Sequence, residues 1–167
     1  PVDYLSGDYT WDWGAERAAL EGRMLDARMR ETGPAAGAGG GPSLSWDLMV
    51  WGFSIIFNKD DEFAGVYQMK NPLHLEQEVS EVLGLGGALM VYVNPERNGW
   101  LVGWQNDIIA EVGEFARERK DWCFQTESAS EAAVLHPAGS HYRRNDPLFN
   151  FGKSHLPIEG ALHSLLE

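Results

Sequence analysis

The chain has 167 residues, of which 44% are hydrophobic, which is enough for one ordinary core or for parts of two. Its formal net charge of -12, from 13 basic and 25 acidic residues, repels phosphate backbones and anionic lipid headgroups, and no run of lysine or arginine compensates for it. Composition therefore predicts a globular α/β protein, argues against nucleic acid and membrane as partners, and leaves the localisation open.

The first part of the chain predicts a loop followed by a helix. Residues 1–14 combine glycine, aspartate and aromatic side chains, a composition typical of a loop or a short irregular strand. From Ala15 to Glu31 the apolar residues follow a helical period. The stretch from Pro34 to Pro42 is almost entirely glycine and alanine, so we expect a flexible surface loop. It lacks the Gly-Lys-Ser/Thr ending of a phosphate loop, so no nucleotide cofactor is expected there.

Two apolar runs then flank a helical pattern. The nearly continuous run from Leu44 to Phe57 predicts a strand that is buried on both faces of a parallel sheet. Asn71 can cap the following helix, with Pro72 at its first position, and Ala88 to Val93 is a second apolar strand. This order is a βαβ unit, so we expect the two strands to lie side by side and parallel, with their carboxyl ends at one edge.

Both later helices show an apolar stripe. In the helix after Pro72, a core-facing spacing is formed by Leu75, Val79, Val82 and Leu83. The acidic residues of that helix are expected on a solvated face: Glu76, Glu78 and Glu81. A third helix is predicted from Gln105 to Lys120.

The character of the chain changes near Ser128, where we place a domain boundary. Ala132 to Leu135 predicts a short buried strand, and a long connection then leads to a final helix from Ile158 to Glu167. That helix stops in mid-pattern and no initiating methionine precedes Pro1, so we expect the chain to be a piece of a longer polypeptide.

Three motifs resemble a known family. Trp46-Asp47, then Trp51-Gly52-Phe53, and then the run from Gly86 to Pro95 resemble the last strands of alpha-L-fucosidase-type glycoside hydrolases, over about residues 44–100. In that family the corresponding motifs read Trp-Glu, Trp-Gly-Tyr and Gly-Gly-Asn-Leu-Leu-Leu-Asn-Val-Gly-Pro. Because Asp47 replaces the glutamate and Phe53 the tyrosine, the resemblance leaves the sugar open.

The resemblance also implies a domain organisation. Residues 128–167 look like the beginning of the amidotransferase-like domain, of the beta-galactosidase trimerisation type, that follows the barrel in many related glycosidases. The implied fold is α/β: residues 1–127 would form the C-terminal portion of a (β/α)8 barrel of the TIM type, and residues 128–167 the first strand and helix of a Rossmann-like domain. Homo-oligomers through the C-terminal domain are a further expectation, with the cluster from His141 to Asp146 as a candidate contact.

Glycoside hydrolysis uses a pair of carboxyl groups, and the candidate catalytic residues are Asp8, Asp12 and Glu16. Asp8 and Asp12 lie among aromatic residues, and burial beside an indole favours the protonated form that a general acid needs. The alternative is that these acids are solvated, or that one of them caps the first helix. Trp11 and Trp13 are candidates for stacking on a sugar ring.

The expected sugar-binding wall lies where the parallel strands end. Trp51 and Phe53 either stack on substrate there or pack under the next helix. Asn94 either bonds sugar hydroxyls or starts a turn before its proline. Asp47 lies near the amino end of its strand and is expected to be structural.

The sequence therefore predicts a glycoside hydrolase, or part of one, with a carbohydrate substrate. A non-catalytic α/β module that binds carbohydrate or protein is the alternative. The histidines show no His-x-x-x-His or His-Glu-x-x-His spacing, so neither a metal site nor a cofactor is predicted.

Overall fold

The computed structural model of the chain describes residues 4–9, 14–32, 46–58, 61–124, 126, 129–137, 139, 143 and 156–166. The chain divides into two compact units, Pro1–Glu127 and Ser128–Glu167. The first unit is mixed α/β, and the second contains the helix α6 (Leu156–Leu166). The predicted loop from Pro34 to Pro42 lies outside the described residues.

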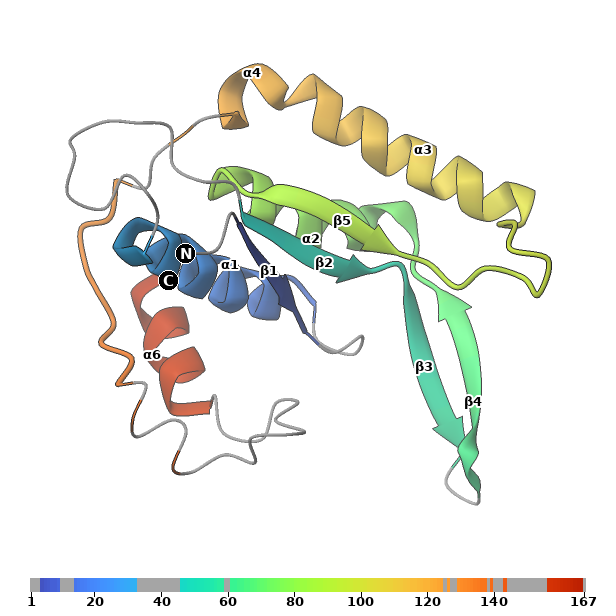
Figure 1. The fold of residues 1–167 in the computed structure, drawn as a ribbon, viewed down its shortest axis with the longest axis horizontal. Helices are drawn as coiled ribbons and strands as arrows, with labels where there is room; N and C mark the ends of the chain where they lie inside the picture. The colour runs from blue at the N-terminus through green and yellow to red at the C-terminus, as the bar shows by residue number, and fades with distance from the viewer. Residues whose placement is uncertain are drawn as a thin grey trace. The chain divides into compact units, whose positions relative to one another are not determined.

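A parallel sheet forms the centre of the first unit. Its strand order is β1 (Leu5–Asp8), β2 (Trp46–Trp51) and β5 (Ala88–Tyr92) (Figure 1). Both pairings are parallel, which confirms that the two predicted apolar strands lie side by side and point the same way. Asp8 pairs with Met49 and Trp51 with Tyr92, so the three strands end at a common carboxyl edge.

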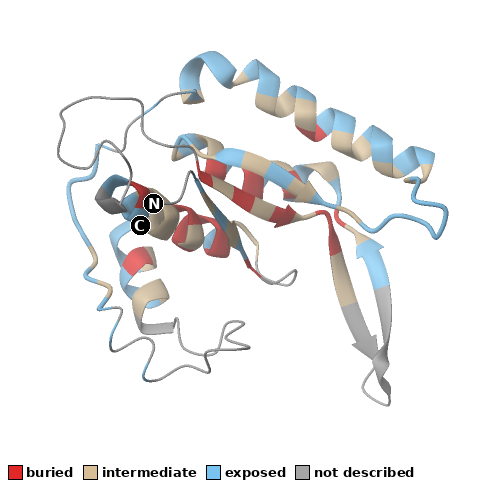
Figure 2. Cartoon of the chain, viewed as in Figure 1, coloured by how far each residue is buried: buried red, intermediate tan, exposed pale blue. Residues whose placement is uncertain are grey.

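Two helices cover the same face of this sheet. Helix α1 (Ala15–Thr32) packs on β1 and β2, helix α2 (Pro72–Gly84) packs on β2 and β5, and the two helices contact each other. Figure 2 shows the buried residues concentrated along β2 and α1. The core-facing side chains of β2 are Trp46, Leu48 and Val50, and α2 adds Leu75, Val79 and Val82. The predicted helices from Ala15 and from Pro72 are confirmed, and Asn71 caps α2 by accepting a hydrogen bond from the His74 backbone N–H at 2.8 Å.

The second face of the sheet is open among the described residues. Strand residues that alternate with the buried ones are exposed or only partly buried: Ser6, Asp8, Asp47, Met49, Trp51, Ala88, Met90 and Tyr92. The prediction that β2 is buried on both faces is therefore wrong for this part of the chain. Among the residues that the structure describes, α1 and α2 cover one face of the sheet, so β2 alternates between buried and half-buried side chains.

The predicted single strand from Leu44 to Phe57 is also wrong, because the chain changes sheet at Gly52. Strand β2 ends at Trp51, and β3 (Phe53–Asn58) pairs antiparallel with β4 (Asp61–Met69) in a separate hairpin. The Gly52 N–H donates to the Tyr92 carbonyl oxygen at 2.8 Å, and the Gly52 carbonyl accepts from the Lys70 N–H at 2.9 Å. A Cβ at Gly52 would lie 2.8 Å from the Tyr92 oxygen, so the close backbone approach requires glycine.

Two further helices complete the first unit. Helix α3 (Gly103–Glu118) confirms the predicted third helix and packs on α2, and the short α4 (Lys120–Cys123) follows it. Val112 is the fully buried residue of α3.

The second unit contains the expected final helix but not the expected strand. Residues 129–137 form no strand, and Leu135 is 87% exposed, so the predicted buried strand from Ala132 to Leu135 is wrong. A short extended segment forms a strand only where a neighbour satisfies its backbone N–H and C=O groups, and a local apolar run does not show whether such a neighbour exists. The α/β class holds for the chain, and the described strands do not close into a barrel.

Candidate functional site

The carboxyl edge of the parallel sheet carries an acidic and an aromatic side chain in direct contact. Asp8 is the last residue of β1, and Trp51 is the last residue of β2. The indole Nε1–H of Trp51 donates a hydrogen bond to Asp8 Oδ1 at 2.8 Å. The Asp8 carboxylate is exposed, so this bond fixes its orientation while leaving it open to a ligand.

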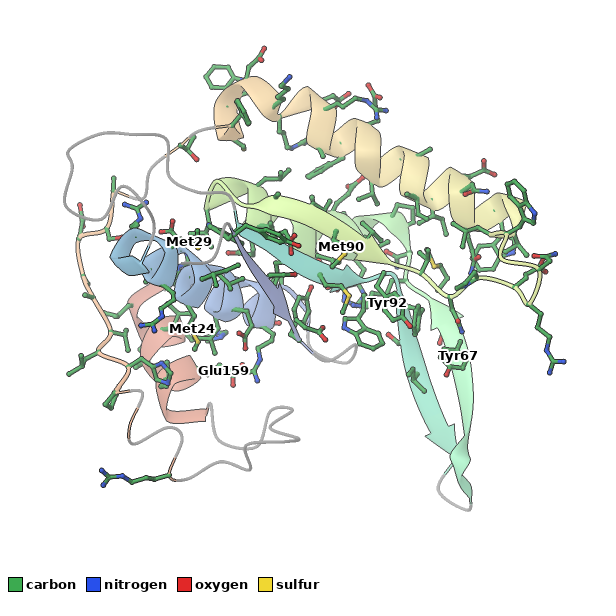
Figure 3. The ribbon with its side chains drawn as sticks, in the orientation of Figure 1. Met24, Met29, Tyr67, Met90, Tyr92 and Glu159 are labelled. Atoms are coloured by element: carbon green, nitrogen blue, oxygen red, sulfur yellow. The ribbon has the colours of Figure 1, made fainter. Side chains whose placement is uncertain are left out.

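Trp51 belongs to a group of four rings that we call the aromatic cluster: Trp51, Phe53, Tyr67 and Tyr92. Its ring meets Tyr92 edge to face at 4.9 Å between centroids, and it meets Phe53 at 5.4 Å. Phe53 also contacts Tyr67 and Tyr92, each at 5.3 Å. Figure 3 labels Tyr67 on β4 and Tyr92 at the end of β5.

The members of the aromatic cluster differ in exposure. Phe53 is only 4% exposed, so its ring is packed among the others. Tyr92 is 39% exposed and Tyr67 is 56% exposed, and Trp51 is half-buried. The exposed tyrosines were not among the predicted site residues, although Tyr92 directly precedes the predicted strand end.

The remaining predicted site residues either lie apart from the Trp51–Asp8 contact or lie outside the described residues. Glu16 is exposed in the first turn of α1, and Asn94 is exposed just beyond β5. Asp12, Trp11 and Trp13 lie outside the described residues.

Asp47 lies near the amino end of β2, as predicted. It accepts a hydrogen bond from the Ser6 hydroxyl at 2.5 Å, which links β1 to β2 on the open face. This contact gives Asp47 the structural role that its position indicates.

A buried polar network includes Tyr9, which directly follows the last residue of β1, and we call it the Glu78 network. Glu78, on α2, accepts hydrogen bonds from the Tyr9 hydroxyl and from Lys70 Nζ, the latter at 2.6 Å. His74 Nε2 lies 3.5 Å from the same carboxylate. The Glu78 and Lys70 side chains are both almost fully buried, and a buried charge pair is stable only when hydrogen bonds satisfy both partners.

Burial raises the pKa of the Tyr9 hydroxyl well above its usual value. The negative charge of Glu78, the hydrogen bond to Glu78 and the charge of Asp8 raise this pKa further. Tyr9 is therefore a permanent hydrogen-bond donor in the folded protein at neutral pH.

The expectation that Glu78 faces solvent is wrong. Glu78 is fully buried, whereas Glu76 and Glu81 on the same helix are partly exposed. Its position contains the missed signal, because residue 78 follows Leu75 by three and precedes Val82 by four, which places it within the apolar stripe. An acid at such a position predicts a buried cation nearby, and Lys70 is that cation.

An open depression of about 300 Å³ lies between the base of the β3–β4 hairpin and the start of α2. The residues that line it are Ser54, Gln68, Met69, Lys70, Asn71 and His74. It shares no residue with the aromatic cluster, and two of its residues belong to the Glu78 network.

No three histidine, cysteine, aspartate or glutamate side chains in the described ranges gather in a way that would hold a metal ion. Within those ranges, no helix has the length and apolar character needed to cross a bilayer.

No protein-family model matches the chain, and no curated protein or solved structure is significantly similar to it. The resemblance to fucosidase-type hydrolases therefore stays a prediction that rests on the sequence motifs alone.

Proposed function

We propose that the chain is part of a glycoside hydrolase and that it binds carbohydrate at the carboxyl edge of β1, β2 and β5. The observation that carries the proposal is the hydrogen bond from Trp51 to Asp8, which places an oriented, exposed carboxylate beside aromatic rings. Aromatic faces stack on the C–H faces of sugar rings, and a carboxylate is the group that glycosidic chemistry requires.

The winding of the sheet is consistent with the barrel part of the proposal. The parallel strands follow each other in the order β1, β2, β5 without reversal, and α1 and α2 lie on one face. A (β/α)8 barrel keeps this strand order and has all its helices outside, and each three-stranded half of a doubly wound sheet does the same, so the winding agrees with a barrel without distinguishing the two folds. In a barrel, the open face would be the interior and the carboxyl edge would surround the active site.

Within this proposal, Asp8 is one of the two carboxyl groups that cleave the glycosidic bond. Retaining enzymes hold the two groups about 5–5.5 Å apart and inverting enzymes about 6.5–9.5 Å apart. Asp47 is unsuited as the second group because it lies at the opposite end of β2 and bonds Ser6. Asp12 and Glu16 stay candidates for that role.

The carbohydrate site is tested by binding. Titration of the chain with methyl glycosides, including methyl α-L-fucoside, is expected to shift the indole N–H signal of Trp51 in NMR spectra. Trp51→Ala is expected to weaken binding at least tenfold, because it removes a stacking surface and the bond that orients Asp8. Trp122→Ala is the matched control, since Trp122 is an exposed indole on α4, at the end of α3 opposite to the end that follows β5. Equal affinities of wild type and Trp51→Ala would disprove the site.

The catalytic role of Asp8 is tested by turnover. In the native polypeptide that contains this chain, Asp8→Asn is expected to lower the hydrolysis of p-nitrophenyl glycosides by about 10²–10⁴-fold, which is the usual contribution of a positioned acid or base. Sugar binding without any hydrolysis by the wild-type polypeptide would instead establish the alternative, a non-catalytic carbohydrate-binding module.

A further inference from the structure

The base of the β3–β4 hairpin has two chemically different faces. Ser54 pairs with Gln68 and Ile55 pairs with Tyr67, and directly opposed residues of an antiparallel pair share a face. Because successive side chains alternate between faces, Ser54 and Gln68 lie on the face opposite to the aromatic cluster. The Ser54–Gln68 pair of this second face lines the depression near the start of α2, together with the residues from Met69 to Asn71 and His74.

Three side chains that line the depression have hydrogen-bond donors or acceptors that are unused among the described residues. In the described part of the chain, neither the Ser54 hydroxyl nor the Gln68 amide makes a hydrogen bond with another residue. Asn71 accepts one bond from the His74 backbone through Oδ1, which leaves its two amide protons available. Hydroxyl and amide groups together can donate to and accept from the same ligand.

The charges around the depression favour a neutral ligand. Its lining contains no aspartate or glutamate, and the ammonium of Lys70 is neutralised by Glu78 at 2.6 Å. An anion would have to compete with the buried Glu78 carboxylate for Lys70, at the cost of breaking the Glu78 network. A neutral, hydroxyl-rich ring can bind without competing with Glu78 for Lys70.

Three of the residues that line the depression are held in place by contacts with the rest of the fold. Lys70 is buried against Glu78, and His74 Nε2 lies 3.5 Å from the same carboxylate. The backbone of Lys70 is bonded to Gly52, and Asn71 is fixed as the cap of α2. Preorganised walls reduce the ordering cost that a small ligand must overcome.

We propose that this depression is a second carbohydrate site, which takes one neutral sugar ring through the hydroxyl of Ser54 and the amides of Gln68 and Asn71. Its volume of about 300 Å³ lies at the small end of the usual range for ligand pockets, which suits a single ring better than a chain. The site goes beyond the function proposed for the carboxyl edge and does not depend on Asp8 or Trp51.

The test is an NMR titration of the isotopically labelled chain with methyl α-L-fucoside, methyl β-D-galactoside and methyl β-D-glucoside. At least one of these sugars is expected to shift the side-chain amide signals of Gln68 and Asn71. Gln68→Ala is expected to weaken that binding about fivefold, which corresponds to the loss of one neutral hydrogen bond. Gln77→Ala, at an exposed position of α2 outside the depression, is expected to leave it unchanged.

The outcomes separate this site from the one at the carboxyl edge. In Trp51→Ala, the shifts of Gln68 and Asn71 are expected to persist with wild-type affinity, so the failure of one site does not entail the failure of the other. Shifts of these amides with inorganic phosphate but with none of the sugars would overturn the proposal in favour of an anion site. Equal sugar affinities of Gln68→Ala and Gln77→Ala would overturn it as well.

Discussion

Glu78 accepts hydrogen bonds from two buried donors, so its charge matters more to stability than that of any exposed acid on α2. We expect Glu78→Gln to lower the free energy of unfolding by about 3–5 kcal/mol, because it leaves the ammonium of Lys70 buried without a counter-charge. Urea unfolding followed by tryptophan fluorescence measures this loss.

The matched control is Glu81→Gln on the same helix. Glu81 pairs with Arg23 at 3.5 Å with about a third of each side chain exposed, so this change is expected to cost less than about 1 kcal/mol. The double variant Lys70→Met with Glu78→Leu removes both charges, and it is expected to be clearly more stable than Glu78→Gln alone. Equal losses in Glu78→Gln and Glu81→Gln would contradict the buried pair.

Tyr9 makes the free energy of unfolding depend on pH in the alkaline range. Its folded-state pKa is raised, chiefly by burial, above the value of about 10 that tyrosine has in an unfolded chain. The stabilisation is therefore complete below about pH 10, and it is lost above that pH because the unfolded state releases a proton that the folded state retains. The loss approaches about 1.4 kcal/mol per pH unit.

Tyr9→Phe isolates this effect from the other titrating groups. The variant lacks the hydroxyl bond to Glu78 and is expected to be less stable than wild type at pH 8, but the difference should shrink between pH 10 and pH 12. Urea midpoints of both proteins across this range provide the measurement, and parallel curves would show that Tyr9 does not titrate as expected.

At the scale of elements, the start of β5 depends on a glycine beside a buried tryptophan. A Cβ at Gly87 would lie 2.3 Å from Cη2 of Trp46, whose ring is buried, so Gly87→Ala must displace that ring. We expect a loss of about 1–3 kcal/mol in the free energy of unfolding. Gly84→Ala, in the last turn of α2 where a Cβ meets nothing within 4 Å, is expected to be neutral or stabilising by up to about 1 kcal/mol. A Gly87→Ala variant as stable as Gly84→Ala would show that Trp46 is not packed against this turn.

The elements also show what the sequence can predict. Helices α1, α2 and α3 and strands β2 and β5 were predictable because each has an apolar period, a cap or a turn signal within its own residues. The break at Gly52 was not predictable from the sequence, because glycine is required there by the Tyr92 carbonyl, which is distant in sequence. Strand β4 was not predictable, because its residues Asp61–Met69 mix charges and glycine with apolar side chains.

The same distinction applies to the candidate site. Trp51 was predictable as a residue at a strand end and Asp8 as an acid among aromatic residues, but their hydrogen bond depends on β1 pairing with β2. The position of Glu78 in the apolar stripe indicates its burial, but its partners Lys70 and Tyr9 come from other elements and are not indicated by the helix alone.

At the scale of the whole first unit, the sheet is asymmetric. Helices α1 and α2 cover one face. On the other, the described residues include three polar side chains, and the apolar Met49, Met90 and Tyr92 are each less than half exposed. Parallel sheets are normally covered on both faces, so an arrangement that covers these three residues would remove apolar side chains from water. The interior of the proposed barrel is one such arrangement.

The accessibility of that face is measurable through its methionines. Met90 is 42% exposed on the open face, whereas Met29 is 3% exposed in α1 (Figure 3). Because oxidation by hydrogen peroxide follows the accessibility of the thioether sulfur, Met90 is expected to become the sulfoxide several times faster than Met29 in the folded chain. Peptide mass spectrometry over a time course measures both rates, and a denatured sample, in which the two rates should converge, is the control.

If Met90 is as protected as Met29 at every protein concentration, the chain covers the face by itself and the barrel interior is the wrong interpretation. Protection that disappears on dilution would instead show that a second copy covers it.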